Sequence, residues 1–334
     1  MNSIQHDPRR DGPADAAAAG GRAAGYSAAL RAVTAASLIA ACLLVVVGDT
    51  VRVTESGMGC ASWPSCNGSF GLPLTYHAFL EQSHRYLAAV VTVLIGVAMI
   101  GAWRHARRDR LIFGSAVAAV GLIAVQVVLG AVTVFAHNAG WTVALHLAGS
   151  WLVLAAVTVT ALGVWLPSRT AAPAGWLGVG AAGALFAVSV SGMVVLHGGA
   201  ANACPGWPIC APGKASAGLV ALQYAHRTLV ALAAVLIVAA ALRVFGSAVA
   251  GRADKVLAGA ALALLAGTAG VGAYVAVSGA PAGGQGAHLA VATALWITLV
   301  ALASSGVSRR AIAAGGAETP GAVGAIAMAE GAGG

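Results

Sequence analysis

Eight long apolar segments constrain the fold of this chain more than any other feature. Each is about 20 residues long, the length that an α-helix needs to cross the hydrocarbon core of a bilayer. Lipid offers no hydrogen-bond partners to the backbone, so such segments cross the membrane as helices. The sequence therefore predicts an all-α integral membrane protein. The expected spans are residues 30–51, 78–103, 111–135, 142–166, 174–196, 219–243, 256–278 and 287–305.

The composition agrees with a membrane location. Charged residues make up 8% of the 334 residues, and hydrophobic residues make up 59%. Soluble domains carry about 25% charged residues, so this chain cannot cover a water-facing surface. The formal net charge is +8, but the basic residues lie in short runs between the spans. This distribution indicates a bilayer and not a nucleic acid as the partner.

The basic residues also predict how the chain is oriented. Four of the 18 lie on one side of the membrane or at the helix starts there, and the other fourteen lie on the opposite side. By the positive-inside rule, the side with fourteen is cytoplasmic. Both termini are then cytoplasmic, and the long loops at 52–77 and 197–218 face outward. The fourteen are Arg9, Arg10, Arg22, Arg31, Arg104, Arg107, Arg108, Arg110, Arg169, Arg243, Arg252, Lys255, Arg309 and Arg310.

The second half of the chain repeats the first. Two histidines and a glycine recur 142 residues later, and the Cys-x-x-Trp-Pro-x-Cys element of the outer loop recurs 144 residues later. We expect two tandem, pseudo-symmetric four-helix bundles, between tails that are disordered and cytoplasmic. The matching pairs are His84 and His226, His146 and His288, Gly130 and Gly272, and Cys60 and Cys204. The expected boundaries are 1–27 for the first tail, 28–170 and 171–308 for the bundles, and 309–334 for the second tail.

Four histidines are the main candidates for a functional site. His84, His146, His226 and His288 each lie in the first turns of an even-numbered span, so all four lie at a similar depth near the outer surface. Two facing imidazoles from separate helices can bind haem iron axially. Zinc usually needs four ligands, and no thiolates or carboxylates accompany each pair in both halves. The pattern favours two haem sites, and a proton relay or structural hydrogen bonds are the alternatives.

The repeat is broken by one carboxylate. Glu81 lies one helical turn before His84, whereas Gln223 occupies the matching place before His226. A carboxylate can take or relay a proton, but an amide can only hydrogen-bond. The first half is therefore suited to reaction and the second to holding a cofactor. The alternative is that Glu81 only pairs with Arg85 or with a cation of the outer loop.

An arginine follows the histidine in both halves, as Arg85 and Arg227. Arginine can bind a carboxylate through two parallel hydrogen bonds, so both are candidates for contact with haem propionates. Anchoring to lipid headgroups is the alternative.

Four of the five cysteines lie in the two outer loops. Thiols outside the membrane tend to be oxidised, and the proline between the members of each pair favours a turn. We predict disulfides Cys60–Cys66 and Cys204–Cys210, with metal binding as a weaker alternative. The fifth, Cys42, lies in the first span and is expected to be an inert core thiol.

Taken together, these motifs resemble the haem A synthase family of the cytochrome-oxidase assembly pathway. The resemblance covers about residues 30–305, and the cysteine pairs in both halves are similar to the Gram-positive type of the family. Glu55 stands where the family often has glycine. The matching elements are Val51-Arg-Val-Thr-Glu-Ser-Gly-Met-Gly-Cys60 leading to Trp63-Pro-Ser-Cys66, Glu81-x-x-His84-Arg85, Gln126-x3-Gly130 leading to His146-Leu147, Cys204 to Cys210, Gln223-x-x-His226-Arg227, and His288.

The resemblance implies an oxidoreductase of the bacterial cell membrane. Such an enzyme oxidises the C8 methyl of haem O to the formyl group of haem A by successive hydroxylations. By this resemblance, His84 and His146 hold the substrate haem beside the catalytic Glu81. His226 and His288 hold a haem b cofactor. Handover of haem O from haem O synthase, a membrane electron donor such as a quinol, and a homo-oligomer are each compatible with the sequence.

Two other functions explain part of the pattern. A di-haem membrane cytochrome that only transfers electrons would need the same four histidines, but it leaves the difference between Glu81 and Gln223 unexplained. A transporter with a duplicated core and a histidine proton relay would bind no haem.

Overall fold

The computed structural model describes residues 26–166, 173–210 and 214–315, with side chains up to Ser304. In this part of the chain there are eight α-helices, each long and apolar enough to cross a membrane, and a short 3-10 helix, η1. The prediction of an all-α integral membrane protein is confirmed. The elements are α2 (Ala28–Val53), η1 (Ser56–Met58), α3 (Tyr76–His105), α4 (Arg110–Phe135), α5 (Gly140–Trp165), α6 (Gly175–His197), α7 (Ala217–Phe245), α8 (Arg252–Val277) and α9 (Ala282–Gly315).

Seven of the eight helices begin one to five residues before the predicted apolar spans, and α6 begins one residue after its span. The fourth and eighth helices begin at Gly140 and Ala282, six residues before their histidines. All four histidines therefore lie in the second or third turn, which agrees with their predicted place in the first turns, although their helices begin earlier than expected. The reason is that hydropathy marks only the part of a helix that lies in hydrocarbon, while backbone hydrogen bonding continues into the polar boundary.

The outer parts of the chain are only partly described. Helix α9 extends to Gly315, ten residues beyond the predicted end of the last span at 305. The predicted disordered tails, apart from residues 26–27 and 309–315, lie outside the described residues.

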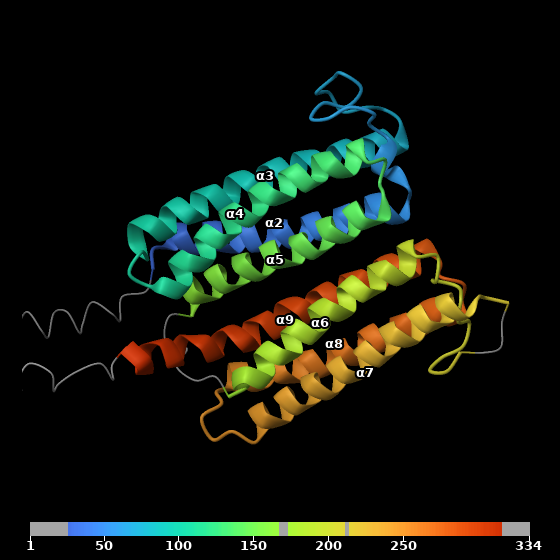
Figure 1. Cartoon of the computed structure of the whole chain (residues 1–334). Coiled ribbons are helices and arrows are strands. Elements are labelled where there is room, and N and C mark those ends of the chain that lie inside the picture. Colours follow the sequence, from blue (N-terminus) through green and yellow to red (C-terminus); the bar gives the residue numbers. More distant parts are fainter. Residues whose placement is uncertain (1–25, 167–172, 211–213, 316–334) are drawn as a thin grey trace, which may run out of the picture.

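The helices form two four-helix groups, which Figure 1 shows side by side. Helices α2 to α5 contact one another, and so do α6 to α9. The two groups meet where α5 and α2 pack against α9 and α6. Both cysteine-containing loops lie at one end of the molecule, and the start of α2 and the end of α9 lie at the other end. Which end is cytoplasmic, and where one half gives way to the other, stay predictions.

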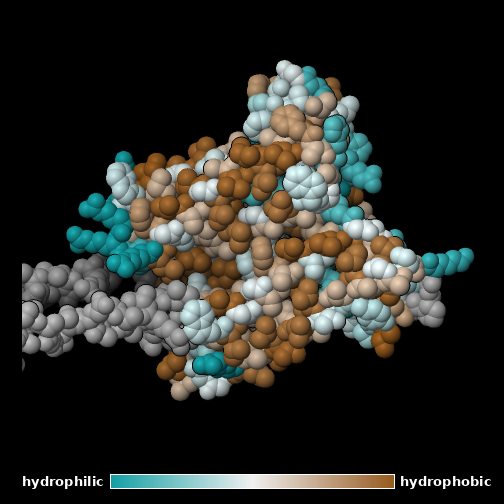
Figure 2. Space-filling view, viewed as in Figure 1, coloured by the Kyte–Doolittle hydropathy of each residue, from teal (hydrophilic) through white to brown (hydrophobic). Residues whose placement is uncertain are grey.

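The surface is suited to lipid along the length of the helices. Figure 2 shows apolar residues over the middle of the molecule and polar residues toward its two ends. Large apolar side chains such as Val93, Val128 and Leu232 point outward from α3, α4 and α7. In lipid these side chains lose nothing by exposure, so burial of apolar surface does not drive the helices together. Close packing and hydrogen bonds must do so instead.

The contact between α5 and α9 shows both of these interactions. The rings of Trp151 and Trp296 are stacked, with centroids 5.3 Å apart and planes 22° from parallel. The indole Nε1 of Trp296 donates to the carbonyl of Trp151 at 2.9 Å. Both side chains are buried. This pair therefore fixes the second four-helix group against the first.

We expect Trp296→Ala to destabilise the protein, because it removes the stacking and the hydrogen bond and leaves a cavity. The loss should be about 3 kcal/mol of unfolding free energy, seen as a lower thermal midpoint in detergent. Trp103→Ala is the matched control, since Trp103 is 53% exposed on α3 and its loss should change stability by about 0.5 kcal/mol or less. Equal shifts in the two variants would contradict the proposed importance of the α5–α9 contact.

Candidate active site

Each of the four histidines packs against a glycine on the preceding helix. A Cβ added to Gly48 of α2 would lie 2.9 Å from Cε1 of His84, and one added to Gly192 of α6 would lie 3.4 Å from Cε1 of His226. The other two histidines are placed in the same way by α4 and α8. A Cβ added to Gly130 would lie 3.5 Å from Cε1 of His146, and one added to Gly272 would lie 2.9 Å from Cε1 of His288. The absence of side chains at these glycines lets the imidazoles lie between the helices.

The two histidines of each half come from separate helices, as predicted, and their pairing around one site stays a prediction. His84 lies on α3 and His146 on α5, while His226 lies on α7 and His288 on α9. Among the described residues, no group of three or more His, Cys, Asp or Glu could hold a metal ion. Each site thus offers two imidazole nitrogens and no further protein ligand. This donor set fits a haem, whose own ring supplies the remaining nitrogens.

The imidazoles differ in what holds their second nitrogen. Nδ1 of His84, of His146 and of His288 is buried without a hydrogen-bond partner. In His226, Nδ1 lies 2.7 Å from Oγ of Ser191 on α6. Sequence reasoning missed Ser191, because hydroxyl residues are common in membrane helices.

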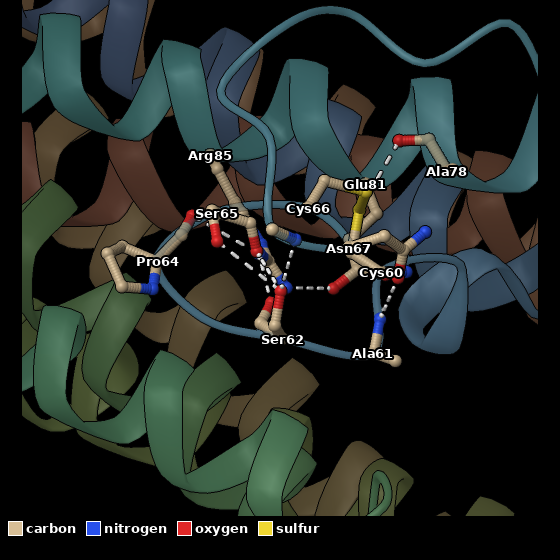
Figure 3. A network of polar contacts seen from close by, with 11 residues as sticks. Cys60, Ala61, Ser62, Pro64, Ser65, Cys66, Asn67, Ala78, Glu81 and Arg85 are labelled. Atoms are coloured by element: carbon tan, nitrogen blue, oxygen red, sulfur yellow. Dashed lines mark hydrogen bonds and ion pairs between the residues drawn. A yellow bond between two sulfur atoms is a disulfide. The ribbon is translucent and has the colours of Figure 1, made fainter.

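Glu81 is held between its own helix and the outer loop, as Figure 3 shows. Its Oε1 accepts from Nη2 of Arg85 at 2.6 Å, and its Oε2 accepts from the backbone N–H of Cys60 at 2.8 Å. The side chain is buried. The pairing with Arg85 that the sequence offered as an alternative is therefore present. It fixes the carboxylate in place one turn from His84.

Arg85 also binds the loop directly. Its Nη1 donates to the carbonyls of Ser62 at 2.7 Å, Ser65 at 3.0 Å and Pro64 at 3.3 Å. These contacts gather the loop over the start of α3 (Figure 3). Arginine has five N–H donors, so the loop does not use all of them.

In the second half the arginine again donates to the loop, but the residue that matches Glu81 donates where Glu81 accepts. Gln223 donates through Nε2 to the carbonyls of Ala200 at 2.8 Å and Ala201 at 3.1 Å. Arg227 donates to the carbonyls of Pro208 and Cys204, each at 3.0 Å. Position 81 and position 223 thus share a structural task, but only position 81 carries a charge.

The structure joins the four loop cysteines in the predicted pairs. Cys60 is bonded to Cys66 and Cys204 to Cys210, with Cα atoms 4.6 and 4.7 Å apart. Cys60 and Cys66 are buried against Ala78 at the start of α3. Cys42 is a free thiol in α2. Each disulfide thus closes a short loop directly above a histidine helix.

A polar link between the halves was not anticipated from the sequence. Asp49 is buried in α2, and its Oδ1 accepts from Nε of Arg52 at 2.8 Å and from Nη2 at 2.7 Å. Nη1 of Arg52 donates to Oε1 of Gln285 on α9 at 3.1 Å. Asp49 follows Gly48, and Gln285 lies one turn before His288. An aspartate inside an apolar span was the signal that could have drawn attention to it.

The fold and the site define a class of protein: an eight-helix membrane protein with two half-buried histidines between the helices of each half. The profile of a family described as cytochrome oxidase assembly protein matches residues 74–300. This match covers more than half of the chain and includes all four histidines. The chain belongs to this family.

Several relatives carry the name heme A synthase. The protein of Symbiobacterium thermophilum is 34% identical over 232 residues, which are 63% of this chain and 73% of the relative. That of Bacillus licheniformis is 30% identical over 231 residues, 64% of this chain and 74% of the relative. That of Geobacillus thermodenitrificans is 29% identical over 195 residues, 54% of this chain and 60% of the relative.

The glycine contacts predict a selective effect on the histidine sites. We expect Gly272→Ala to displace the imidazole of His288, since the new methyl group would lie 2.9 Å from its Cε1. The affinity of the purified protein for haem should fall by about tenfold, which is the usual effect of losing a group that orients a metal ligand. Gly270→Ala is the control, because a Cβ there meets nothing within 4 Å. Normal haem binding by Gly272→Ala would show that His288 is not a ligand.

Proposed function

We propose that this protein converts haem O to haem A. It is a membrane oxidoreductase that oxidises the C8 methyl of the substrate haem to a formyl group by successive hydroxylations. The observation that carries this proposal is the asymmetry between two otherwise matched histidine pairs. Only the first pair has a carboxylate, Glu81, buried one turn away. The names of the relatives support the same activity.

Four histidines serve as ligands in this proposal. His226 and His288 hold haem b as the resident cofactor, and His84 and His146 hold haem O as the substrate. The haem iron supplies the redox chemistry when it is bound. The chain itself supplies the imidazole nitrogens, the orientation of both rings and a site between helices that excludes bulk water.

Glu81 is the proposed catalytic residue. Its carboxylate takes or relays a proton during oxidation of the methyl group, a task that the amide of Gln223 cannot perform. Arg85 and the N–H of Cys60 hold the carboxylate still, so it need not reorganise during the reaction. The outer loop therefore contributes to the site by fixing Glu81.

Arg85 and Arg227 are proposed to contact haem propionates with the N–H groups that the loops leave free. Their loop contacts place both guanidinium groups at the level of the disulfide loops. One arginine can then bind a loop carbonyl and a carboxylate at once.

The proposed setting is the bacterial cell membrane, with the disulfide loops on the extracytoplasmic side and both termini in the cytoplasm. Haem O arrives through the membrane, supplied by haem O synthase. Electrons come from a membrane donor such as a quinol.

The direct test is expression of the chain in cells that make haem O but lack haem A synthase. We expect haem A in the extracted haem, identified by absorbance and mass, and none in cells without the gene. His226→Ala and His288→Ala should each abolish the stably bound b-type haem. Bound haem without any haem A would favour the electron-transfer cytochrome. A purified protein with no Soret band, even after haem supplementation, would favour the transporter.

A second experiment tests the role of Glu81. We expect Glu81→Gln to fold and to keep its b-type haem, because Gln223 shows that an amide can anchor the loop. Haem A formation should fall on the order of 100-fold, the scale of a lost proton-transfer group. Glu55→Gln is the matched control, since it removes one charge from the outer loop without touching the site. Near-normal haem A formation by Glu81→Gln would make Glu81 a loop anchor only.

A further inference from the structure

Ser191 of α6 makes a hydrogen bond that sets one histidine apart from the others. Its Oγ lies 2.7 Å from Nδ1 of His226 on α7. The same Oγ donates its hydrogen to the carbonyl of Val188, one turn earlier in α6, at 2.8 Å. A hydroxyl has a single hydrogen, so Ser191 accepts from the N–H of His226. The imidazole of His226 then has its proton on Nδ1 and a free lone pair on Nε2.

The first half has no equivalent of this hydrogen bond. With the offset of 144 residues that relates the outer loops, Ser191 corresponds to Val47. The structure supports this correspondence, because Gly192 and Gly48, the next residues, lie against the same atom of His226 and His84. Valine offers no acceptor, and Nδ1 of His84 is buried without a partner. The two halves therefore have matching packing, but only the second fixes the proton of this histidine.

A fixed outer hydrogen bond changes what a histidine ligand can do. It sets the tautomer and the ring orientation, and it makes the ligating nitrogen more basic. A site with this support holds its haem more tightly than a site without it. This is the difference expected between a resident cofactor and a substrate that must leave as product.

We propose that Ser191 is the positioning residue that makes the second half the haem-retaining half. It holds His226 with Nε2 directed to the iron, whereas Val47 leaves His84 without that support. This inference rests on the proposed function, in which His226 binds haem b and His84 binds haem O.

The test uses the full chain purified with its haem and three variants. Ser191→Val installs the residue of the first half, and Ser191→Thr keeps the hydroxyl. The third, Val47→Ser, is made in a His226→Ala, His288→Ala background, where only the first half can bind haem. The measurements are the rate of haem loss to an excess of apomyoglobin, and the reduction potential of the bound haem.

We expect Ser191→Val to lose haem about tenfold faster than the parent. Its reduction potential should rise, because a less basic ligand stabilises the ferric state less. Ser191→Thr should stay close to the parent in both measurements. Val47→Ser should slow haem loss from the first half relative to its own background.

Two outcomes would overturn the role of Ser191. One is an unchanged rate of haem loss and an unchanged potential in Ser191→Val. The other is equal impairment in Ser191→Val and Ser191→Thr, which would indicate packing and not hydrogen bonding. Failure of the proposed function is seen separately, as a parent protein without haem or as normal haem content in His226→Ala.

Discussion

The close approach of imidazole rings to helix backbones is the contact on which the rest of this structure depends. Side chains of ordinary size on α2, α4, α6 and α8 would fill the space that the four histidines occupy, and glycine at one position of each helix leaves it open. In lipid, small residues allow helices to come close enough for packing and hydrogen bonds to hold them. Here the same close approach also places the four candidate haem ligands between the helices, so packing of the bundle and placement of these imidazoles share one cause.

The outer loops are hydrogen-bonded to the histidine helices α3 and α7, through partly different groups in the two halves. An arginine on the histidine helix binds loop carbonyls in both halves, and the residue at the position of Glu81 or Gln223 binds the loop backbone as well. Glu81 is thus an anchor by its contacts, and its carboxylate suits it for the proposed catalytic role. A carboxylate buried beside a histidine is costly in a membrane. The shared anchoring task explains why the amide suffices in one half, and the proposed chemistry explains why the carboxylate is present in the other.

Much of the fold could be predicted from the sequence, because the length of each apolar segment and the internal repeat are read directly from residue types and their spacing along the chain. The eight spans were predicted in the right order, but the helix ends were not, since α5 and α9 begin at small residues, Gly140 and Ala282, that lie before the predicted apolar segments. The pairing of the histidines, inferred from their matched depth, stays a prediction. Ser191 and Asp49 were missed because their roles depend on the neighbouring helix. Ser191 matters only where α6 meets His226, and Asp49 only where Arg52 reaches Gln285 on α9.

The sequence by itself determined that the chain crosses the membrane eight times, that its halves repeat, and that histidines recur at one depth with a carboxylate in one half only. These properties are carried by residue type and spacing along single helices. Only the tertiary structure decided which groups the polar side chains bind: Glu81 with Arg85 and Cys60, Arg52 with Gln285, and Ser191 with His226. The physical reason is that a hydrogen bond requires its two atoms to be within about 3 Å. The packing of helices far apart in the sequence sets those distances.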